Sequence, residues 1–229
     1  FQAKPLAFQN SLLSIENDYT ENTLPKINVR FPVQGQKLPA DHGYLLYAAI
    51  SQTKPELHKA GWLGIELISG VPFDKGLIAL PTRGANLHLR IPADKFGKVL
   101  SLAGKRLEID GYPIRLGIPK AQPLLPAPTL YSRIVTFRNS LEVLKFLEKA
   151  NQEFAEKEIT ANLEIPKETQ ARTRRIITIK DKKIVGFSLI AHGLNDDDSL
   201  QLQSEGLRGR RSMGCGIFNP IRKPYDFEG

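Results

Sequence analysis

The sequence predicts an α+β protein built from two ferredoxin-like domains in tandem, each with the element order βαββαβ. Two observations predict this fold class. A proline-rich segment divides the chain into comparable halves, and the same order of strand-like and helix-like stretches occurs on either side of it. A glycine-rich loop, GLRGRRSMGCGIF over residues 206–218, follows the last predicted helix and completes the second domain.

The dividing segment reads GIPKAQPLLPAPTL over residues 117–130 and holds four prolines within ten residues. Proline fixes its own φ angle and lacks a backbone N–H, so this composition fits neither a helix nor a central strand. We therefore expect an N-terminal ferredoxin-like domain over residues 1–118, a Pro-rich linker over 119–129 and a C-terminal ferredoxin-like domain over 130–229.

The first half opens with an alternating stretch, KINVRFPV (26–33), which predicts a strand. A helix follows in HGYLLYAAIS (42–51), with Asp41 as its N-cap. Three strand-like stretches, a second helix closed by Gly104 and a hairpin turned at Asp110-Gly111 complete the half. Their ranges are 62–69, 76–81, 86–92, 93–102 and 106–118.

The second half repeats that order. It predicts a strand, a helix with Ser140 as its cap, another strand, a long hairpin turned at 181–183, a helix with an acidic first turn, and a closing strand CGIF. Their ranges are 130–137, 140–155, 158–165, 174–194, 196–206 and 215–218. A four-stranded, RRM-like sheet of this kind is a common platform for RNA.

Composition limits the function classes. The chain has 229 residues, of which 41% are hydrophobic, and no apolar run of 18 residues, so we expect a globular protein with no membrane span. The single cysteine, Cys215, excludes an internal disulfide, and the four histidines lie far apart without zinc-ligand spacing. We expect a cytoplasmic protein with no metal site and no cofactor.

The net charge of +8 favours a polyanionic partner. Basic residues crowd the stretch TQARTRRIITIKDKK (169–183), which predicts a cationic first strand of a hairpin. They also crowd the glycine-rich loop. One interpretation of the hairpin charge is protection of a solvated edge strand; the interpretation we favour is contact with nucleic acid.

The glycine-rich loop matches neither a Walker A loop nor a dinucleotide fingerprint, because it follows a helix and precedes a strand. It has a structural interpretation, a helix C-cap at Gly206 followed by a bulge. We favour an RNA-facing interpretation, in which Gly214 and Gly216 leave one strand face without side chains and a phosphate backbone approaches beside the arginines. The predicted contact residues are Arg208, Gly209, Arg210, Arg211, Ser212 and Gly214.

With these stretches identified, the chain resembles the repeat-associated mysterious protein (RAMP) superfamily. Within that superfamily it is similar to the CRISPR-associated endoribonucleases that cut precursor CRISPR RNA within its repeats. The resemblance covers residues 28–220 and rests on LPADHGYLLYAAIS, GYPIRLGIPKAQPLLPAPTLYSRIVTF and FSLIAHGLNDDDSLQLQSEGLRGRRSMGCGIFNP.

The resemblance implies a reaction without metal. The ribose 2′-OH attacks the adjacent phosphate, which gives a 2′,3′-cyclic phosphate and a 5′-OH. It also implies two kinds of partner: a CRISPR repeat RNA stem-loop, against which Arg172, Arg174 and Arg175 contact the stem, and other subunits of a Cascade-type complex.

Histidine suits these proton transfers because its ordinary pKa lies near neutrality. His42 begins the first predicted helix, where the resemblance places the catalytic histidine. At helical spacing it also lines up with Leu46 and Ala49, so a buried, structural role stays open. His58, in a predicted connection, is the second candidate, and Tyr44 is a weak candidate for the assisting residue, with ordinary packing as its alternative.

Two other functions stay open. One is a catalytically silent subunit that binds the CRISPR repeat, within an effector complex or a CRISPR-associated transposon complex. The other is an unrelated basic protein with two ferredoxin-like domains.

Overall fold

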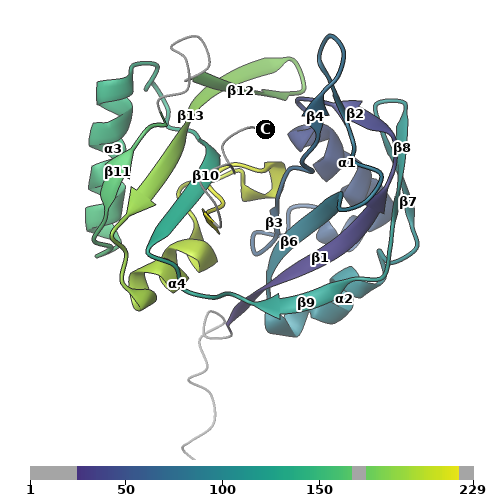
Figure 1. Cartoon of the computed structure of the whole chain (residues 1–229), viewed down its shortest axis with the longest axis horizontal. Coiled ribbons are helices and arrows are strands. Elements are labelled where there is room, and N and C mark those ends of the chain that lie inside the picture. The colour runs from purple at the N-terminus through teal and green to yellow at the C-terminus, as the bar shows by residue number, and fades with distance from the viewer. Residues whose placement is uncertain (1–24, 167–173, 222–229) are drawn as a thin grey trace, which may run out of the picture.

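The computed structural model describes residues 25–166 and 174–221. Figure 1 shows two lobes side by side, each formed by an antiparallel sheet and two α-helices. The first lobe contains the elements from β1 to β9, and the second contains those from β10 to β14. Arg172, one of the predicted RNA contacts, lies outside the described residues.

The main sheet of the first lobe has the strand order β3-β6-β1-β8-β7, and β9 pairs with β1. Its elements are β1 (Lys26–Gln34), α1 (Gly43–Thr53), η1 (Pro55–Leu57), β3 (Gly64–Ile65), β6 (Asn86–Pro92), η2 (Ala93–Lys95), α2 (Phe96–Leu100), β7 (Arg106–Ile109), β8 (Tyr112–Leu116) and β9 (Lys120–Pro123). A separate three-stranded sheet is formed by β2 (Lys37–Pro39), β4 (Val71–Pro72) and β5 (Leu77–Ala79).

The sheet of the second lobe has the corresponding order, β11-β13-β10-β14, with β12 paired to β13. Its elements are β10 (Thr129–Val135), α3 (Val143–Glu156), β11 (Asn162–Glu164), β12 (Arg174–Ile179), β13 (Lys182–His192), α4 (Asp196–Glu205), η3 (Arg211–Met213) and β14 (Asn219–Pro220). In the first lobe β1 lies between β6 and β8, and in the second β10 lies between β13 and β14. This central position of the first strand confirms the predicted pair of ferredoxin-like folds.

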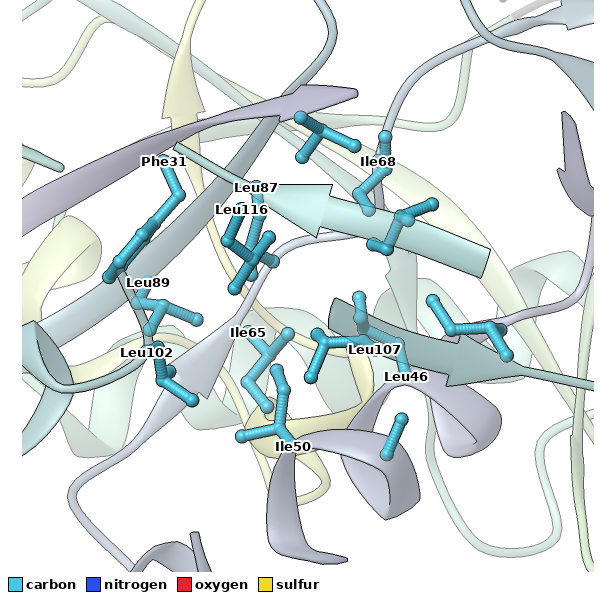
Figure 2. Close-up of a cluster of buried hydrophobic side chains, with 14 of the residues drawn as sticks. Phe31, Leu46, Ile50, Ile65, Ile68, Leu87, Leu89, Leu102, Leu107 and Leu116 are labelled. Atoms are coloured by element: carbon cyan, nitrogen blue, oxygen red, sulfur yellow. The ribbon is translucent and has the colours of Figure 1, made fainter. Parts of the chain in front are cut away.

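Each lobe has its own hydrophobic core. In the first, alternate residues of β1 are buried on one face of the sheet, and Phe31 belongs to one cluster with Leu46 and Ile50 of α1 (Figure 2). In the second, Phe146 of α3 packs against Phe187 of β13 with ring centroids 4.9 Å apart. The opposite face of the second sheet carries polar side chains beside a smaller apolar cluster of Ile134, Ile177 and Cys215.

Both apolar and polar contacts join the lobes in the described part of the chain, and Met213 of the second lobe packs against the core of the first. The Lys26 ammonium donates to the Ser204 carbonyl over 2.9 Å, and the Thr178 N–H donates to the Asp41 carboxylate over 2.7 Å. The Arg211 guanidinium reaches the Gly61 carbonyl at 3.0 Å. The buried Arg90 side chain of β6 donates to Gln203, Phe218 and Asn219 of the second lobe, and it also donates to Glu66 of its own lobe.

The Pro-rich segment is not a free linker along its whole length. Its residues Lys120–Pro123 form β9, which runs antiparallel to β1 with its side chains exposed. Proline is tolerated here because β9 lies at the edge of the sheet, where a missing N–H costs no internal hydrogen bond.

The C-cap predicted at Gly206 ends α4 as expected, but both predicted N-caps are wrong. His42 is the N-cap residue of α1, while the Asp41 carboxylate accepts the Thr178 N–H from the other lobe. Helix α3 begins later than predicted, with Glu142 as its N-cap, and the Ser140 hydroxyl lies 3.5 Å from the Arg138 carbonyl. A tertiary contact therefore replaces the local capping bond at Asp41, whereas the Ser140 hydroxyl bonds to a neighbouring carbonyl before the helix begins.

Three further expectations differ in detail. The predicted strand 62–69 shortens to Gly64–Ile65, and the hairpin between β12 and β13 turns at Lys180-Asp181. The stretch CGIF is buried but forms no strand, since β14 comprises only Asn219–Pro220. The Asp110-Gly111 turn is as predicted, with positive φ at both residues.

Candidate active site

A cavity of about 590 Å³ lies between the lobes, and we call it the interlobe cavity. The first lobe supplies Ala40 before α1 and the segment 66–70 after β3. The second lobe supplies residues of β10 and β12 and the end of the glycine-rich loop. Its charged lining residues are Glu66, Arg133, Arg174 and Arg175. A volume of this order accommodates a ligand of small-molecule size, such as one or two nucleotides.

One wall of the cavity is the polar face of the second sheet. The Ser188 hydroxyl, on β13, donates to the main-chain carbonyl of Arg133 over 2.7 Å. It also accepts from the Tyr131 hydroxyl at 3.3 Å and from the Arg175 Nε at 3.2 Å. These bonds connect β10, β12 and β13 beside the cavity and hold the Arg175 side chain against the sheet.

His42 lies directly behind the cavity wall and has no exposed surface. Its Nδ1 is 2.8 Å from the Pro39 carbonyl, which can only accept, so Nδ1 carries the proton. Its Nε2 accepts the Ile68 N–H over 3.0 Å. Ile68 belongs to the segment that lines the cavity. One backbone segment therefore separates the imidazole from the cavity.

Burial lowers the pKa of His42 to about 4, although its bond to Pro39 acts in the opposite direction. The nearby Arg133 charge lowers this pKa further. The imidazole is therefore neutral at neutral pH, with a lone pair on Nε2. This is the protonation state that a general base needs, but the Ile68 N–H occupies the lone pair in this structure.

The two other predicted catalytic residues do not line the cavity. Tyr44 is half-buried and packs against the core of the first lobe. His58 is exposed, and its ring stacks on Tyr47, whose hydroxyl lies 3.2 Å from the His58 Nδ1. The structure therefore brings neither residue to the cavity wall beside His42.

The glycines of the C-terminal loop serve the fold of this chain. A Cβ on Gly216, which has a φ of +65°, would collide with the Leu207 carbonyl. A Cβ on Gly214, with a φ of +85°, would lie 2.9 Å from the Leu67 side chain. Both glycines are buried, so the predicted bare strand face is wrong, because protein atoms occupy the space beside them. Gly214 nevertheless lines the cavity.

Much of the charge in the loop is already engaged. Arg208 pairs with Glu153 at 2.8 Å and lies over the Phe137 ring, and Arg211 donates to main-chain carbonyls of both lobes. Arg210 is exposed and donates to the Thr136 hydroxyl over 3.1 Å. Gly209 is exposed and Ser212 is half-buried. RNA contact by these residues stays a prediction.

The cationic strand β12 does border the cavity. Arg174 and Arg175 are both cavity-lining residues, from a strand that pairs with β13. Asp196, Asp197 and Asp198 form the first turn of α4, where the Asn195 side chain accepts the Asp198 N–H. Their role at this helix end is the dipole complementarity that the sequence predicts.

Sequence reasoning missed Tyr131 and Arg133. Both lie in the predicted strand LYSRIVTF, and their spacing of two residues places them on the same sheet face. An arginine within an otherwise apolar strand was the signal that could have identified the cavity wall. Their proximity to His42 depends on how the two lobes pack, which no local pattern encodes.

Within residues 25–166 and 174–221, no three His, Cys, Asp or Glu side chains are grouped as a metal site would require. The helices in this part of the chain are all too short or too polar to cross a membrane.

Comparison with known proteins identifies the family. The model of the family described as Cas6 Crispr matches residues 27–223. The chain belongs to the Cas6 family. A curated relative from Myxococcus xanthus (strain DK1622), the CRISPR-associated endonuclease Cas6, is 37% identical over 199 residues, which is 87% of this chain and 83% of the relative. The resemblance predicted from the sequence is thereby confirmed.

Solved structures agree in fold. One described as a CRISPR associated protein Cas6 superposes with a TM-score of 0.62 at 15% identity, covering 86% of this chain and 99% of that one. Another, described as a RAMP protein binding different RNA substrates, has a TM-score of 0.61 at 12% identity and covers 85% and 99%. At this identity the likeness concerns the fold alone, so in this Cas6 protein the roles of single residues must be argued from its own geometry.

Proposed function

We propose that this Cas6-family endoribonuclease cuts precursor CRISPR RNA within its repeats, without a metal ion, and that the scissile phosphate enters the interlobe cavity. The observation that supports the proposal is the composition of the cavity wall, where three arginines surround a space directly beside His42. Arginine binds phosphate through a planar, permanently charged group, and histidine exchanges protons near neutral pH.

In this mechanism His42 takes the proton of the attacking ribose 2′-OH. The 2′-oxygen bonds to phosphorus, the bond from phosphorus to the 5′-oxygen breaks, and a proton donor supplies the leaving oxygen. The products are a 2′,3′-cyclic phosphate and a 5′-OH. The Ile68 N–H must leave the His42 Nε2 before the imidazole can act, so the segment 66–70 must shift when RNA binds.

The RNA stem is proposed to lie against β12, whose Arg174 and Arg175 border the cavity. Arg172 would extend this contact, and the exposed loop residues Gly209 and Arg210 would extend it on the other side. After cleavage the protein would stay on the 3′ stem-loop as a subunit of a Cascade-type complex. Because precursor CRISPR RNA is transcribed in the cytoplasm, we place the enzyme there.

The first prediction tests His42. The purified protein is incubated with a panel of 5′-labelled CRISPR repeat RNAs in EDTA, and the single-turnover cleavage rate is measured. His42→Ala should lower this rate by about a thousandfold, because general base catalysis contributes roughly 10² to 10⁴. Its affinity for the same RNA with a 2′-deoxy residue at the cut should stay within a fewfold of wild type.

The matched control is His192→Ala, which removes a histidine at the end of β13 that does not line the cavity. Undiminished cutting by His42→Ala would show that His42 is not the general base. If His58→Ala lost cutting instead, His58 would be the general base. If EDTA abolished cutting by the wild type, the metal-free route would be wrong.

A second function is favoured by one observation, the complete burial of His42 with both ring nitrogens bonded to the backbone. In a catalytically silent subunit that only binds the repeat, these bonds would be permanent and His42 structural. Specific binding of a repeat RNA by the wild type, without any cleavage product, would establish that function.

A further inference from the structure

The side chain of Arg133 is the feature of the interlobe cavity that the protein itself leaves unexplained. Arg133 lies on β10, the central first strand of the second sheet, and lines the cavity. Within the described ranges, its guanidinium donates no hydrogen bond and forms no ion pair. By contrast, its main-chain carbonyl accepts the Ser188 hydroxyl over 2.7 Å, which anchors the backbone of Arg133 to β13.

An unpaired guanidinium in a half-buried position is unfavourable for folding. Burial lowers the pKa of Arg133, and the like charge of Arg175 lowers it further. Both effects oppose a cation at this place. A residue that serves only the fold would not require a charge here, because a neutral side chain would avoid both costs. Such a local conflict with stability is typical of a ligand-binding position.

The carboxylates near the cavity are engaged elsewhere. The Asp41 charge acts on Arg133, but the two form no ion pair among the described residues, and the Asp41 Oδ2 accepts the Thr178 N–H. Glu66 lies 3.2 Å from the Arg90 guanidinium, which holds it at the lobe junction. Among the described lining residues, Arg133 is therefore a positive charge that an entering anion would neutralise.

The anion that fits is a phosphodiester. A guanidinium donates two parallel N–H bonds to non-bridging phosphate oxygens, and the cavity has room for a nucleotide step. The site also lies beside the proposed base, since Ile68 lines the same cavity and donates its N–H to the His42 Nε2, and the Arg133 charge lowers the pKa of His42. A phosphate held by Arg133 would therefore be the phosphate nearest to His42.

We propose that Arg133 binds the phosphodiester that is cut and stabilises the negative charge that develops on its non-bridging oxygens. The inference rests on the proposed function and assigns to one residue the cationic role in that reaction. When the 2′-oxygen bonds to phosphorus and before the bond to the 5′-oxygen breaks, the phosphorane carries an extra negative charge. Arg133 stays protonated throughout, and the transferred protons pass through other groups.

The second prediction tests this role with Arg133→Gln and Arg133→Lys. Single-turnover cleavage of the repeat RNA that the wild type cuts should fall by about 10² to 10³ in Arg133→Gln, which is the effect of removing one donor to a developing charge. Arg133→Lys keeps the charge and should recover part of the rate. The control is Arg115→Gln, which replaces an exposed arginine of the first lobe that does not line the interlobe cavity. This variant should cut at the wild-type rate.

Binding to a modified RNA separates contact from structure. The repeat RNA is made with a 2′-deoxy residue at the mapped cut and with either a phosphodiester or an uncharged methylphosphonate there. The wild type and Arg115→Gln should prefer the phosphodiester by about tenfold, while Arg133→Gln should show no preference. The melting temperature of Arg133→Gln should equal or exceed that of the wild type, because an unpaired charge is removed.

The outcomes are distinguishable. If the wild type neither binds nor cuts any repeat RNA, both the proposed function and the role of Arg133 are wrong. If the wild type cuts and Arg133→Gln cuts equally fast, only the role of Arg133 is wrong. The same holds if Arg133→Gln keeps the tenfold preference for the phosphodiester. A lower melting temperature of Arg133→Gln together with an unchanged preference would show that Arg133 is structural.

Discussion

At the scale of single residues, His42 shows how a side chain can be placed for chemistry and still be unavailable. The Pro39 carbonyl fixes its tautomer, and the Ile68 N–H occupies the remaining nitrogen. Both partners are backbone groups, so the imidazole is held by chain geometry rather than by another side chain. A small movement of the segment 66–70 would be enough to free Nε2.

The third prediction concerns the stability of this buried histidine. The pKa of His42 is about 4 in the folded protein, below the ordinary value of 6.5, so the unfolded chain binds its proton more readily. The stability that depends on a neutral His42 is fully present above pH 6.5 and is lost as the pH falls toward 4. Between pH 7 and pH 4 the wild type should lose about 3 kcal/mol more unfolding free energy than His42→Gln, measured by urea denaturation. Parallel pH profiles of the two proteins would contradict the burial of a neutral imidazole.

At the scale of elements, the glycine-rich loop is a closed, internally bonded turn. The Leu207 N–H donates to the Gly216 carbonyl over 2.9 Å, and the Gly216 N–H donates to the Ile134 carbonyl over 2.8 Å. These bonds tie the beginning and the end of the loop together and attach both to β10. The loop therefore sets the shape of the cavity wall that Gly214 and Ile217 form.

The fourth prediction follows from the close contacts in this loop. Gly216→Ala should lower the unfolding free energy by about 2 kcal/mol or more, because its Cβ would meet the Leu207 carbonyl at a positive φ. Gly209→Ala is the matched control, since a Cβ there has no neighbouring atom within 4 Å and it should change stability by less than about 0.5 kcal/mol. Equal denaturation midpoints for the two variants would show that the loop relaxes without cost.

At the scale of the whole molecule, the relative position of the two lobes depends on apolar packing around Met213 and on a set of buried polar contacts. Arg90 is the principal one, with 3% of its surface exposed. It donates to the Gln203 carbonyl over 2.6 Å and to the Asn219 side chain over 2.7 Å, both in the second lobe. Burial lowers the pKa of Arg90, and the Glu66 charge acts to raise it. This contact is therefore one of those that hold the walls of the interlobe cavity together.

The fifth prediction tests that contact. Arg90→Met should lower the unfolding free energy by about 3 kcal/mol, because Glu66 is left without its buried partner. Arg115→Met, at an exposed position, is the control and should have little effect. Scanning calorimetry would detect the change, and we expect the two lobes to unfold in less concerted steps. A single, unshifted transition would show that the other lobe contacts suffice.

The fold was predictable because its information is local. Alternation in the strand that contains Phe31, the Asp110-Gly111 turn and the repeated element order each follow from neighbouring residues. The cavity was not predictable in the same way, because Arg133 and His42 are distant in sequence and meet only when the lobes pack. The N-cap predicted at Asp41 is wrong for a related reason, since Asp41 accepts the Thr178 N–H of the other lobe.

The burial of Cys215 has a practical consequence for labelling the protein. Burial raises the pKa of this thiol to about 12, so almost no reactive thiolate is present at neutral pH. The chain has no second cysteine that would compete with an introduced one. A Gly209→Cys variant, with its thiol on the exposed part of the loop, would therefore take up a maleimide fluorophore at one site without first removing Cys215.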